Sequence, residues 1–410
     1  MNAQQPVIDS WSCPTTIFAG SAAFRHWCEG AATGTHVLVV DEAVWQRHNA
    51  LLATAGSVAT VRIGSDASHA ERLEMITAAM ARHPQATILA VGGGSVLDAA
   101  RLAVLANSDA RVRPALAAGT GMAMFPAARD AAANVVCVPT TIGTAAEVSP
   151  IAVYRHERRR VMVVSPALRA RTAIIDPTFT ATVTRGSLAA GLLEPWSRAV
   201  VPAVCGQRLL LADNLAAALR QTIEVLGCEL AAGADEPALG GGAHAGVSEA
   251  WRLAAALSSA QTHTAFLSLG RSAFGHALWP FATELSAAFQ VPKSHVLTWL
   301  VPAWLDGVAL GALGPAFGTP ERVHTVLAES PGDAAVAFRR WCAELGVAAH
   351  IHMSTAAVPD MRADERSPST PSDVVASITA TWLTGGFFLA GVTEAEVAWL
   401  VERAWAERVR

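Results

Sequence analysis

The sequence predicts an α/β domain built on a parallel sheet, followed by an all-helical domain. Three observations favour this fold class. Short apolar runs rich in β-branched residues alternate with helical patterns up to residue 175. From Thr184 onward, helical patterns follow one another with few β-branched runs. The chain has 410 residues, which is long enough for about two domains. We place the division at Asp176-Pro-Thr178, which gives domains of residues 1–178 and 179–410.

The elements of the first domain follow the order of a doubly wound parallel sheet, in which ligands bind at the carboxyl ends of strands. Helical signals cover residues 70–83 and 96–106, and strand signals cover 35–41, 57–63, 86–91 and 134–138. In the second domain, residues 393–396 form a capping box that opens a last amphipathic helix, 394–408. Proline, aspartate and glycine interrupt the apolar stretch 297–317, which predicts a buried helix followed by a loop rather than a membrane span.

A glycine turn follows the predicted strand 86–91. Residues 92–95 read Gly-Gly-Gly-Ser and lead into the predicted helix 96–106. Glycine lets a ligand approach the backbone closely, and a helix N-terminus presents free N–H groups that attract phosphate. A strand-to-helix turn without a ligand has the same pattern. A second strand end rich in glycine and hydroxyl groups, residues 138–149, favours a nucleotide-binding edge.

Composition excludes several functional classes. The net charge is −4 and the pI is near 6.4, so no basic field indicates nucleic acid or an anionic membrane as a partner. The first residues lack the basic and apolar regions of a signal peptide, and the six cysteines include no Cys-x-x-Cys pair. We therefore expect a cytoplasmic protein with reduced cysteines, without a disulfide framework or a zinc ribbon.

The motifs together resemble the iron-containing alcohol dehydrogenase family, within the superfamily that also contains dehydroquinate synthases. The segments that carry the resemblance extend over most of the chain. They are Gly92 to Arg101, with arginine where the family has lysine, Pro139 to Val148, Asp176-Pro177, Phe274 to Ala277, Pro292 to Pro302 and Val392 to Val397.

The resemblance implies an N-terminal domain that binds NAD or NADP and a helical domain, with the cofactor and usually a divalent metal in the cleft between them. The residues bordering the pyrophosphate and nicotinamide ribose would be Gly93, Gly94, Ser95 and Asp98. Those lining the nicotinamide side would be Thr140, Thr141 and Thr144. The family tendency to dimerise implies a homodimer.

Asp41 ends the first predicted strand. An acid there would accept hydrogen bonds from the adenosine ribose and repel a 2′-phosphate, which favours NAD over NADP. An acid that caps a turn or helix would occur at the same place, and both interpretations stay open.

The metal-binding pattern of the family is altered at its first two positions. The family uses an aspartate, a histidine four residues later, and two further histidines. Without a gap, the first two positions are Leu193 and Ser197. With a one-residue shift they are Glu194 and Arg198. Neither pair reproduces the ligands.

At the remaining positions, His276 matches the third ligand, Lys293 stands at the fourth and Pro280 replaces a further histidine. Because a divalent ion needs three or four nitrogen or oxygen ligands, two interpretations follow. In the favoured one no metal binds, and Lys293 supplies the positive charge that polarises the substrate oxygen. In the other, a rearranged set of Glu194, His276 and His295 resembles the site of dehydroquinate synthases.

Tryptophans are frequent in the segments that the resemblance places around the cleft. Core packing is the ordinary role of such residues. Trp196 and Trp279 stand beside altered ligand positions, which favours a reshaped, more apolar pocket. The four tryptophans are Trp196, Trp279, Trp299 and Trp304. We interpret His263, in a neighbouring segment, as structural.

These residues predict an NAD-dependent dehydrogenase acting on an alcohol or carbonyl compound, with His276 and Lys293 as its catalytic candidates. The substrate would be a small molecule or a peptide, and daptide-type oxidation of a C-terminal threonine is one such reaction. Two alternatives stay open: a non-catalytic or partner-dependent subunit of a tailoring complex, and a cyclase-type lyase similar to dehydroquinate synthase. The lost ligands motivate the first alternative, whereas the retained Asp98 argues against it.

Overall fold

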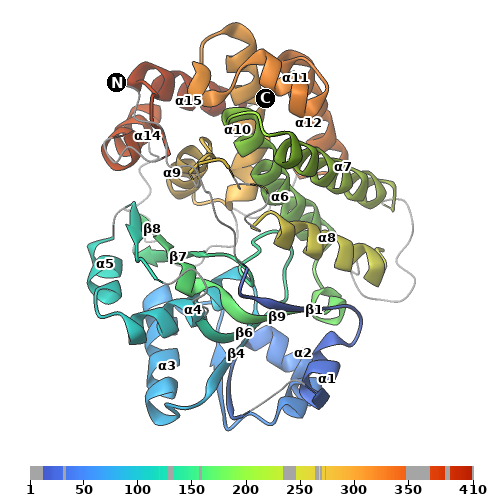
Figure 1. Ribbon diagram of the computed structural model, residues 1–410, viewed down its shortest axis with the longest axis vertical. Coiled ribbons are helices and arrows are strands. Elements are labelled where there is room, and N and C mark those ends of the chain that lie inside the picture. Colours follow the sequence, from blue (N-terminus) through green and yellow to red (C-terminus); the bar gives the residue numbers. More distant parts are fainter. Residues whose placement is uncertain are drawn as a thin grey trace. The chain divides into compact units, whose positions relative to one another are not determined.

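The computed structural model describes residues 13–30, 34–119, 121–127, 133–156, 159–233, 246–263, 267, 270–272, 274–347, 370–383 and 388–408. These residues form two compact units (Figure 1). The first lies within Ser12–Thr184 and Ala238–Thr264, and the second within Arg185–Pro237 and Ala265–Arg410. The first unit thus takes in a later segment that the predicted division at residue 178 assigns to the helical domain.

The first unit is built on a six-stranded sheet in which every pair of neighbouring strands is parallel. The strand order is β1-β9-β6-β4-β2-β3. The predicted parallel sheet is therefore confirmed. Its strands are β1 (Thr16–Ala19), β2 (His36–Asp41), β3 (Ala59–Ile63), β4 (Thr87–Gly92), β6 (Ala133–Pro139) and β9 (Ala170–Ile175).

Both faces of this sheet are buried, because successive side chains of a strand point to opposite faces. In β2, Val37 and Val39 join the core beneath helices α3 and α4, whereas Leu38 and Val40 join the core beneath α1 and α2. This arrangement explains the continuous apolar runs seen in the sequence. The helices are α1 (Ala23–Gly30), α2 (Glu42–Leu52), α3 (His69–Arg82) and α4 (Gly94–Ser108).

A smaller sheet and two more helices complete the first unit. Strands β7 (Ile151–His156) and β8 (Arg159–Val164) pair antiparallel, and β5 (Met122–Met124) pairs with β8. Helix α5 covers Val112–Ala118. Helix α8 (Glu249–Gln261) is held to the unit by Arg252, which is buried and donates a hydrogen bond to the carbonyl of Thr180.

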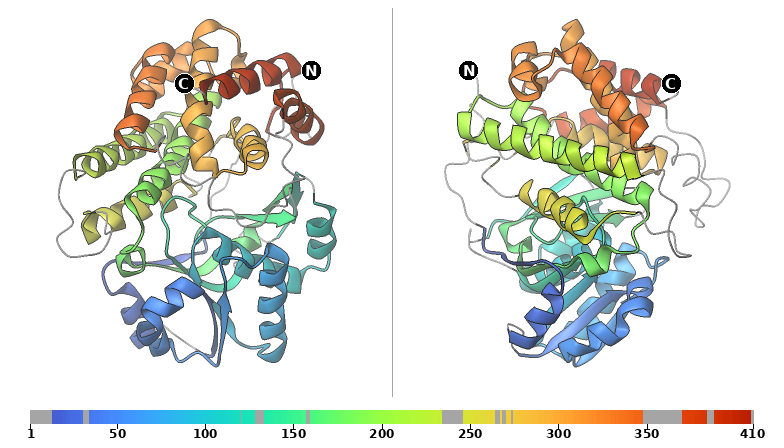
Figure 2. Two further views of the ribbon diagram at one scale, coloured as in Figure 1. Left: turned by 180° about the vertical axis from the view of Figure 1, so that it is seen from behind. Right: turned by 90° about the vertical axis from the view of Figure 1, so that its right-hand side faces the viewer.

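The second unit is helical in its described residues, as predicted, and Figure 2 shows it from two further sides. Helices α6 and α7 pack along each other, and α10 contacts α6, α9, α12 and α15. The helices are α6 (Arg185–Cys205), α7 (Leu210–Ala232), α9 (Trp279–Phe289), α10 (Lys293–Leu310), α11 (Pro320–Leu327), α12 (Pro331–Glu344), α14 (Pro371–Ile378) and α15 (Glu394–Glu407).

Two local predictions for this unit are confirmed. The apolar stretch 297–317 begins inside α10, which is largely buried, and ends in a short 3₁₀ turn at Pro315–Phe317. Among the described helices, none combines the length and apolarity needed to cross a bilayer. The capping box also forms, since the backbone N–H of Thr393 donates to Glu396 at 2.7 Å and the Thr393 hydroxyl accepts from the Glu396 N–H.

Candidate functional site

The two sequence motifs of the first unit pack directly against each other. Gly92 ends β4, Gly93 precedes the first turn of α4, and Gly94 is its first residue. A Cβ atom at Gly94 would lie 2.9 Å from Cγ2 and 3.0 Å from Oγ1 of Thr144, closer than ordinary contacts. At Gly93 it would lie 3.4 Å from Thr141. Glycine is therefore required at Gly94 for the threonine segment to approach the turn.

This arrangement leaves the N-terminus of α4 able to bind an anion. No side chain caps the helix, and its first turn carries no acidic residue. Its free N–H groups and the positive end of the helix dipole both favour phosphate. Around the turn, Ser95, Thr141 and Thr144 are exposed, whereas Thr140 is buried and donates its N–H to the carbonyl of Gly92.

Asp98 has a defined structural contact. Its carboxylate accepts hydrogen bonds from the backbone N–H of Val153 in β7 at 2.9 Å and from the guanidinium of Arg101. Arg101 is fully buried and also donates to the carbonyls of Ser149 and Ile151. The pair thus ties α4 to the start of β7, next to the glycine turn. A direct role of Asp98 toward a cofactor stays a prediction.

Asp41 caps a helix. Its side chain accepts a hydrogen bond from the Ala43 N–H at 2.9 Å, as the N-cap residue of α2. The capping interpretation is thus realised in the structure, and the ribose interpretation stays a prediction, since one carboxylate can do both.

In the helical unit, one altered metal position, Ser197, lies next to the retained histidine, His276. The Oγ atom of Ser197 on α6 lies 3.3 Å from Nε2 of His276. The Ser197 hydroxyl donates to the carbonyl of Glu194 at 2.9 Å. We infer that Nε2 of His276 carries the ring proton and that this N–H donates a hydrogen bond to the Ser197 oxygen. Nδ1 of His276 is then a buried acceptor without a hydrogen-bond partner among the described residues.

His276 stays neutral in this environment. It is 8% exposed. Burial, followed by the positive charges of Arg198 and Lys293, lowers its pKa to about 3. Protonation would place a third positive charge beside two others in a buried site.

Lys293, at the fourth metal position, is the first residue of α10. Its Nζ atom lies 3.8 Å from the centre of the Trp279 ring, a cation–π contact. The Trp279 ring meets the His276 ring nearly edge-on, with centroids 5.5 Å apart. Ser197, His276, Trp279 and Lys293 therefore form one continuous group of side chains, which we call the cationic cluster together with Arg198.

The donor set of the cationic cluster does not fit a divalent metal. Leu193 offers no lone pair, and the ammonium of Lys293 has none to give. In the alternative set, Glu194 pairs with Arg198 at 3.3 Å. Across the described part of the chain, no three histidine, cysteine, aspartate or glutamate residues are grouped so as to hold a metal ion.

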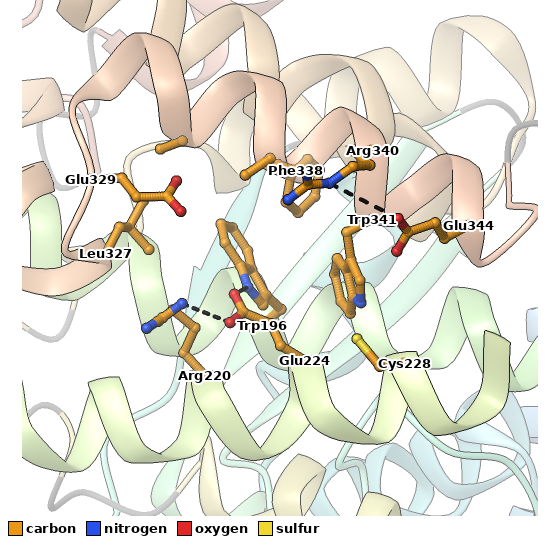
Figure 3. Close-up of a pocket in the computed structure, with 12 residues that line it drawn as sticks. Trp196, Arg220, Glu224, Cys228, Leu327, Glu329, Phe338, Arg340, Trp341 and Glu344 are labelled. Atoms are coloured by element: carbon orange, nitrogen blue, oxygen red, sulfur yellow. Dashed lines mark hydrogen bonds and ion pairs between the residues drawn. The ribbon is translucent and has the colours of Figure 1, made fainter. Parts of the chain in front are cut away.

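The tryptophans divide into one at the cluster and three elsewhere. Trp196 lies in a groove between α7 and α12, where it packs on Phe338 and donates to Glu224 at 2.8 Å (Figure 3). Successive helical residues point about 100° apart, so Trp196 and Ser197 face different neighbours. The expected contribution of Trp196 to a pocket at the altered ligands is therefore wrong. Trp304 donates to the carbonyl of Phe317 and Trp299 packs on Phe289, as core residues do.

Two side-chain contacts were not predicted from the sequence. The His263 ring lies 3.3 Å from the Ser149 hydroxyl within the first unit, which fits its structural interpretation. The sequence predicts Trp279 only as part of an apolar pocket, whereas its ring contacts the Lys293 ammonium. One sequence signal points to Lys293: it is the only lysine among the 30 lysine and arginine residues of the chain.

Comparisons with known proteins agree with the glycine and threonine motifs. Residues 14–177 match the sequence model of the family described as iron-containing alcohol dehydrogenase. A phosphonoacetaldehyde reductase of Streptomyces viridochromogenes is 42% identical over 131 residues, 28% of this chain and 31% of the relative. Long-chain-alcohol dehydrogenase 1 of Geobacillus thermodenitrificans is 35% identical over 153 residues, 37% of this chain and 38% of the relative. The matches thus span about a third of each curated relative.

The fold extends the likeness to the whole chain. NADH-dependent butanol dehydrogenase A from Thermotoga maritima has a TM-score of 0.73 at 17% identity, covering 98% of this chain and 99% of its own. Sulfoacetaldehyde reductase from Bifidobacterium kashiwanohense, solved with NAD+, has a TM-score of 0.67 at 15% identity, covering 97% and 98%. The chain thus shares with both solved structures a fold of an α/β and a helical unit. The predicted resemblance to the iron-containing alcohol dehydrogenases is confirmed by sequence over residues 14–177, and the remainder of the chain is similar to the solved structures in fold.

Proposed function

We propose that the protein is an NAD(P)-dependent oxidoreductase that interconverts an alcohol and a carbonyl compound. The observation that carries this proposal is the uncapped N-terminus of α4, against which the threonine segment packs at Gly94. Such a helix end suits the pyrophosphate of a dinucleotide. The names of both curated relatives, a reductase and an alcohol dehydrogenase, support the same reaction type.

A bound nicotinamide would supply the hydride chemistry, and Lys293 of the cationic cluster would give a proton to the substrate oxygen or take it back, without a metal ion. During reduction, a hydride from the reduced nicotinamide would reach the carbonyl carbon while the Lys293 ammonium gives a proton to the carbonyl oxygen. Oxidation would reverse both transfers. Lysine suits this role because it can release a proton, which arginine does not.

His276 would orient this group rather than accept the proton. Its lowered pKa, about 3, makes it a weak base near neutral pH. Its hydrogen bond to Ser197 and its edge contact with Trp279 hold the ring on which Lys293 rests. His276 is therefore proposed as a positioning residue.

For the cofactor we propose NAD over NADP, on the charge of Asp41 at the end of β2. Calorimetric titration with NADH and NADPH tests this choice. Tighter binding of NADH is expected, and removal of the charge by Asp41→Asn should narrow the difference. Tighter binding of NADPH by the unaltered protein would contradict it.

The proposed reaction is tested by following NADH absorbance with aldehydes, ketones and alcohols, before and after treatment with a chelator. We expect cofactor turnover that survives the chelator, in protein without stoichiometric metal. Activity lost with the chelator and restored by zinc would contradict the metal-free reaction. Absence of NAD(P)H binding would contradict the proposal as a whole.

The substrate would be a small molecule or a peptide, handled by a homodimer. One peptide reaction is oxidation of a C-terminal threonine side chain, which gives a β-keto acid that then loses carbon dioxide. Mass spectrometry of threonine-ended peptides with NAD tests it.

Tight cofactor binding without turnover of any probe would favour the partner-dependent subunit, which the replaced ligands motivate. Zinc bound at Glu194 would favour the lyase, but the Glu194–Arg198 pair argues against it.

A further inference from the structure

Helix α7 is apolar on two opposite sides, and only one of them is covered. Its inner side packs mainly on α6 and contributes buried residues that include Ile223 and Leu226. Its outer side, which faces the viewer in the right-hand view of Figure 2, exposes Leu211 by 63%, Leu215 by 39% and Val225 by 56%. A helix that is apolar all round is normally buried on all sides. The outer side of α7 is therefore a surface that a further partner would cover.

The outer residues of α7 have the spacing of a coiled-coil seam. Starting at residue 211, exposed positions recur after four and three residues in turn, up to residue 229. This spacing keeps side chains on one line along a helix and suits packing against a second helix. The line is about 27 Å long. We call these six residues the outer stripe: Leu211, Leu215, Ala218, Thr222, Val225 and Glu229.

The middle of the outer stripe is suited to close contact. The hydroxyl of Thr222 donates a hydrogen bond to the carbonyl of Ala218 at 2.9 Å, within the same helix. An approaching helix would therefore meet no unsatisfied hydroxyl there. Ala218 is small, and the distance between two packed helices depends on the size of the side chains where they cross.

The two ends of the outer stripe differ in charge. Arg208 is exposed just before α7 begins, and Glu229 is exposed near its end. A second copy in the parallel orientation would bring like charges together at both ends. In the antiparallel orientation, Arg208 of one copy lies near Glu229 of the other, at both ends. Two copies so arranged are related by a twofold axis, the commonest symmetry of homodimers.

The outer stripe is thus complementary to itself in both shape and charge. We propose that two copies of this chain associate through it, with their α7 helices antiparallel about an axis between Ala218 and Thr222. Leu215 of each copy then lies opposite Val225 of the other. This inference gives the expected homodimer a surface, and it is independent of the proposed reaction because its tests need no turnover.

Sedimentation velocity over a range of concentrations tests the association. The contact is one helix wide, at the small end of specific interfaces, so we expect a dimer with a Kd in the micromolar range. Val225→Asp buries a charge opposite Leu215 and should raise the Kd at least about 100-fold. Val58→Asp, on a valine of the first unit that is 48% exposed, is the matched control and should leave the Kd unchanged. If a second face also pairs copies, Val225→Asp still halves the mass of the assembly.

Charge exchange tests the orientation of the two helices. Arg208→Glu and Glu229→Arg each bring like charges together at both ends of the antiparallel pair. Each should raise the Kd by about 10-fold, because two symmetric contacts change at once. The double variant Arg208→Glu/Glu229→Arg restores opposite charges and should recover the original Kd. A double variant that associates more weakly than either single one would overturn the antiparallel pairing.

A distance between two labels measures the same orientation directly. Cys228 is exposed on α7 and can carry a nitroxide label, with Cys228→Ser protein as the background control. In the antiparallel dimer the two labels should lie about 25 Å apart by pulsed electron resonance, and in a parallel one less than about 15 Å. The short distance, or a dimer that Val225→Asp does not weaken, would overturn the inference. So would a monomer at every concentration, which would leave the outer stripe to a different protein.

Discussion

At Gly94, a single hydrogen atom in place of a side chain determines how closely two motifs approach. The packing of Thr144 on the first turn of α4 leaves no room for a methyl group, since its Cβ would lie 2.9 Å from Thr144 Cγ2. The backbone conformation is not the constraint, because Gly94 begins an ordinary helical turn. Sequence motifs of this kind therefore record contacts between segments as well as contacts with ligands.

We expect Gly94→Ala to weaken NADH binding by roughly 10-fold, because the methyl group displaces the threonine segment by a few tenths of an ångström. Calorimetry measures the affinity. The double variant Gly94→Ala/Thr144→Ala removes the atoms that the methyl group meets and should recover part of the loss, whereas Thr144→Ala alone serves as the control. Full affinity in Gly94→Ala would show that the close approach is irrelevant to the cofactor.

His276 predicts a pH dependence of stability. Its pKa falls from 6.5 to about 3 on folding, so the unfolded chain binds a proton more readily than the native protein. The stabilisation is present above pH 6.5 and is lost as pH falls toward the folded pKa. For this group alone, the free energy of unfolding should drop by about 2 kcal/mol between about pH 7 and pH 5.

Chemical denaturation at about pH 7 and about pH 5 measures this change in the free energy of unfolding. His276→Gln cannot titrate, so its loss of stability between them should be smaller by about the same 2 kcal/mol. An equal loss in both proteins would mean that His276 titrates normally.

At the scale of elements, the sheet was predictable because its signals are local. Strands β2 and β4 are buried on both faces, so their residues form nearly uninterrupted apolar runs, whereas Arg171 interrupts the run of β9, which was not predicted. The hairpin of β7 and β8 was missed because arginines in both strands, Arg155 and Arg160 among them, hide the alternation. Strand β1 was missed because its four residues are mostly exposed at the sheet edge.

The candidate site was predictable in its parts and not in its contacts. The glycine and threonine motifs are each contiguous in sequence. Ser197 and His276 lie on different segments 79 residues apart, and only the helical packing brings them to 3.3 Å. Consecutive residues of one helix can also contact different parts of the fold: Trp196 packs on Phe338, whereas Ser197 contacts His276.

Arg101 connects α4 to β7, so its replacement should lower the free energy of unfolding. Arg101→Met leaves the Asp98 carboxylate and the carbonyls of Ser149 and Ile151 without their buried donor. We expect a destabilisation of about 3 kcal/mol, measured from the urea midpoint. Arg101→Lys retains the charge and one donor and should lose clearly less, and an unchanged midpoint in Arg101→Met would refute the tie between α4 and β7.

At the scale of the whole molecule, the α/β unit is discontinuous in sequence. Its sheet is complete at Ile175, but α8 joins it from residues beyond the first two helices of the other unit. Arg252 and Glu249 provide the connection, through the Thr180 carbonyl and the Ser21 hydroxyl. The unit therefore depends on a segment that a division at residue 178 would remove.

A fragment ending at Thr184 should accordingly unfold at a lower temperature than the α/β unit of the full chain. Limited proteolysis during heating measures this difference. Arg252→Met in the full chain serves as the comparison and should shift the cleavage in the same direction, because the Thr180 carbonyl loses its buried donor. A fragment as resistant as the full chain would show that α8 adds nothing.

The late arrival of α8 also bears on how the chain folds during synthesis. Domains ordinarily fold in turn as they leave the ribosome, the N-terminal one first. Here the strands of the parallel sheet have all been translated by residue 175, but the α/β unit is complete only after helix α8, Glu249–Gln261, has been translated. Two long helices of the other unit, α6 and α7, are translated in the interval. Until α8 has been translated, the nascent chain therefore lacks the contacts that α8 makes with β9 and with the turn after it.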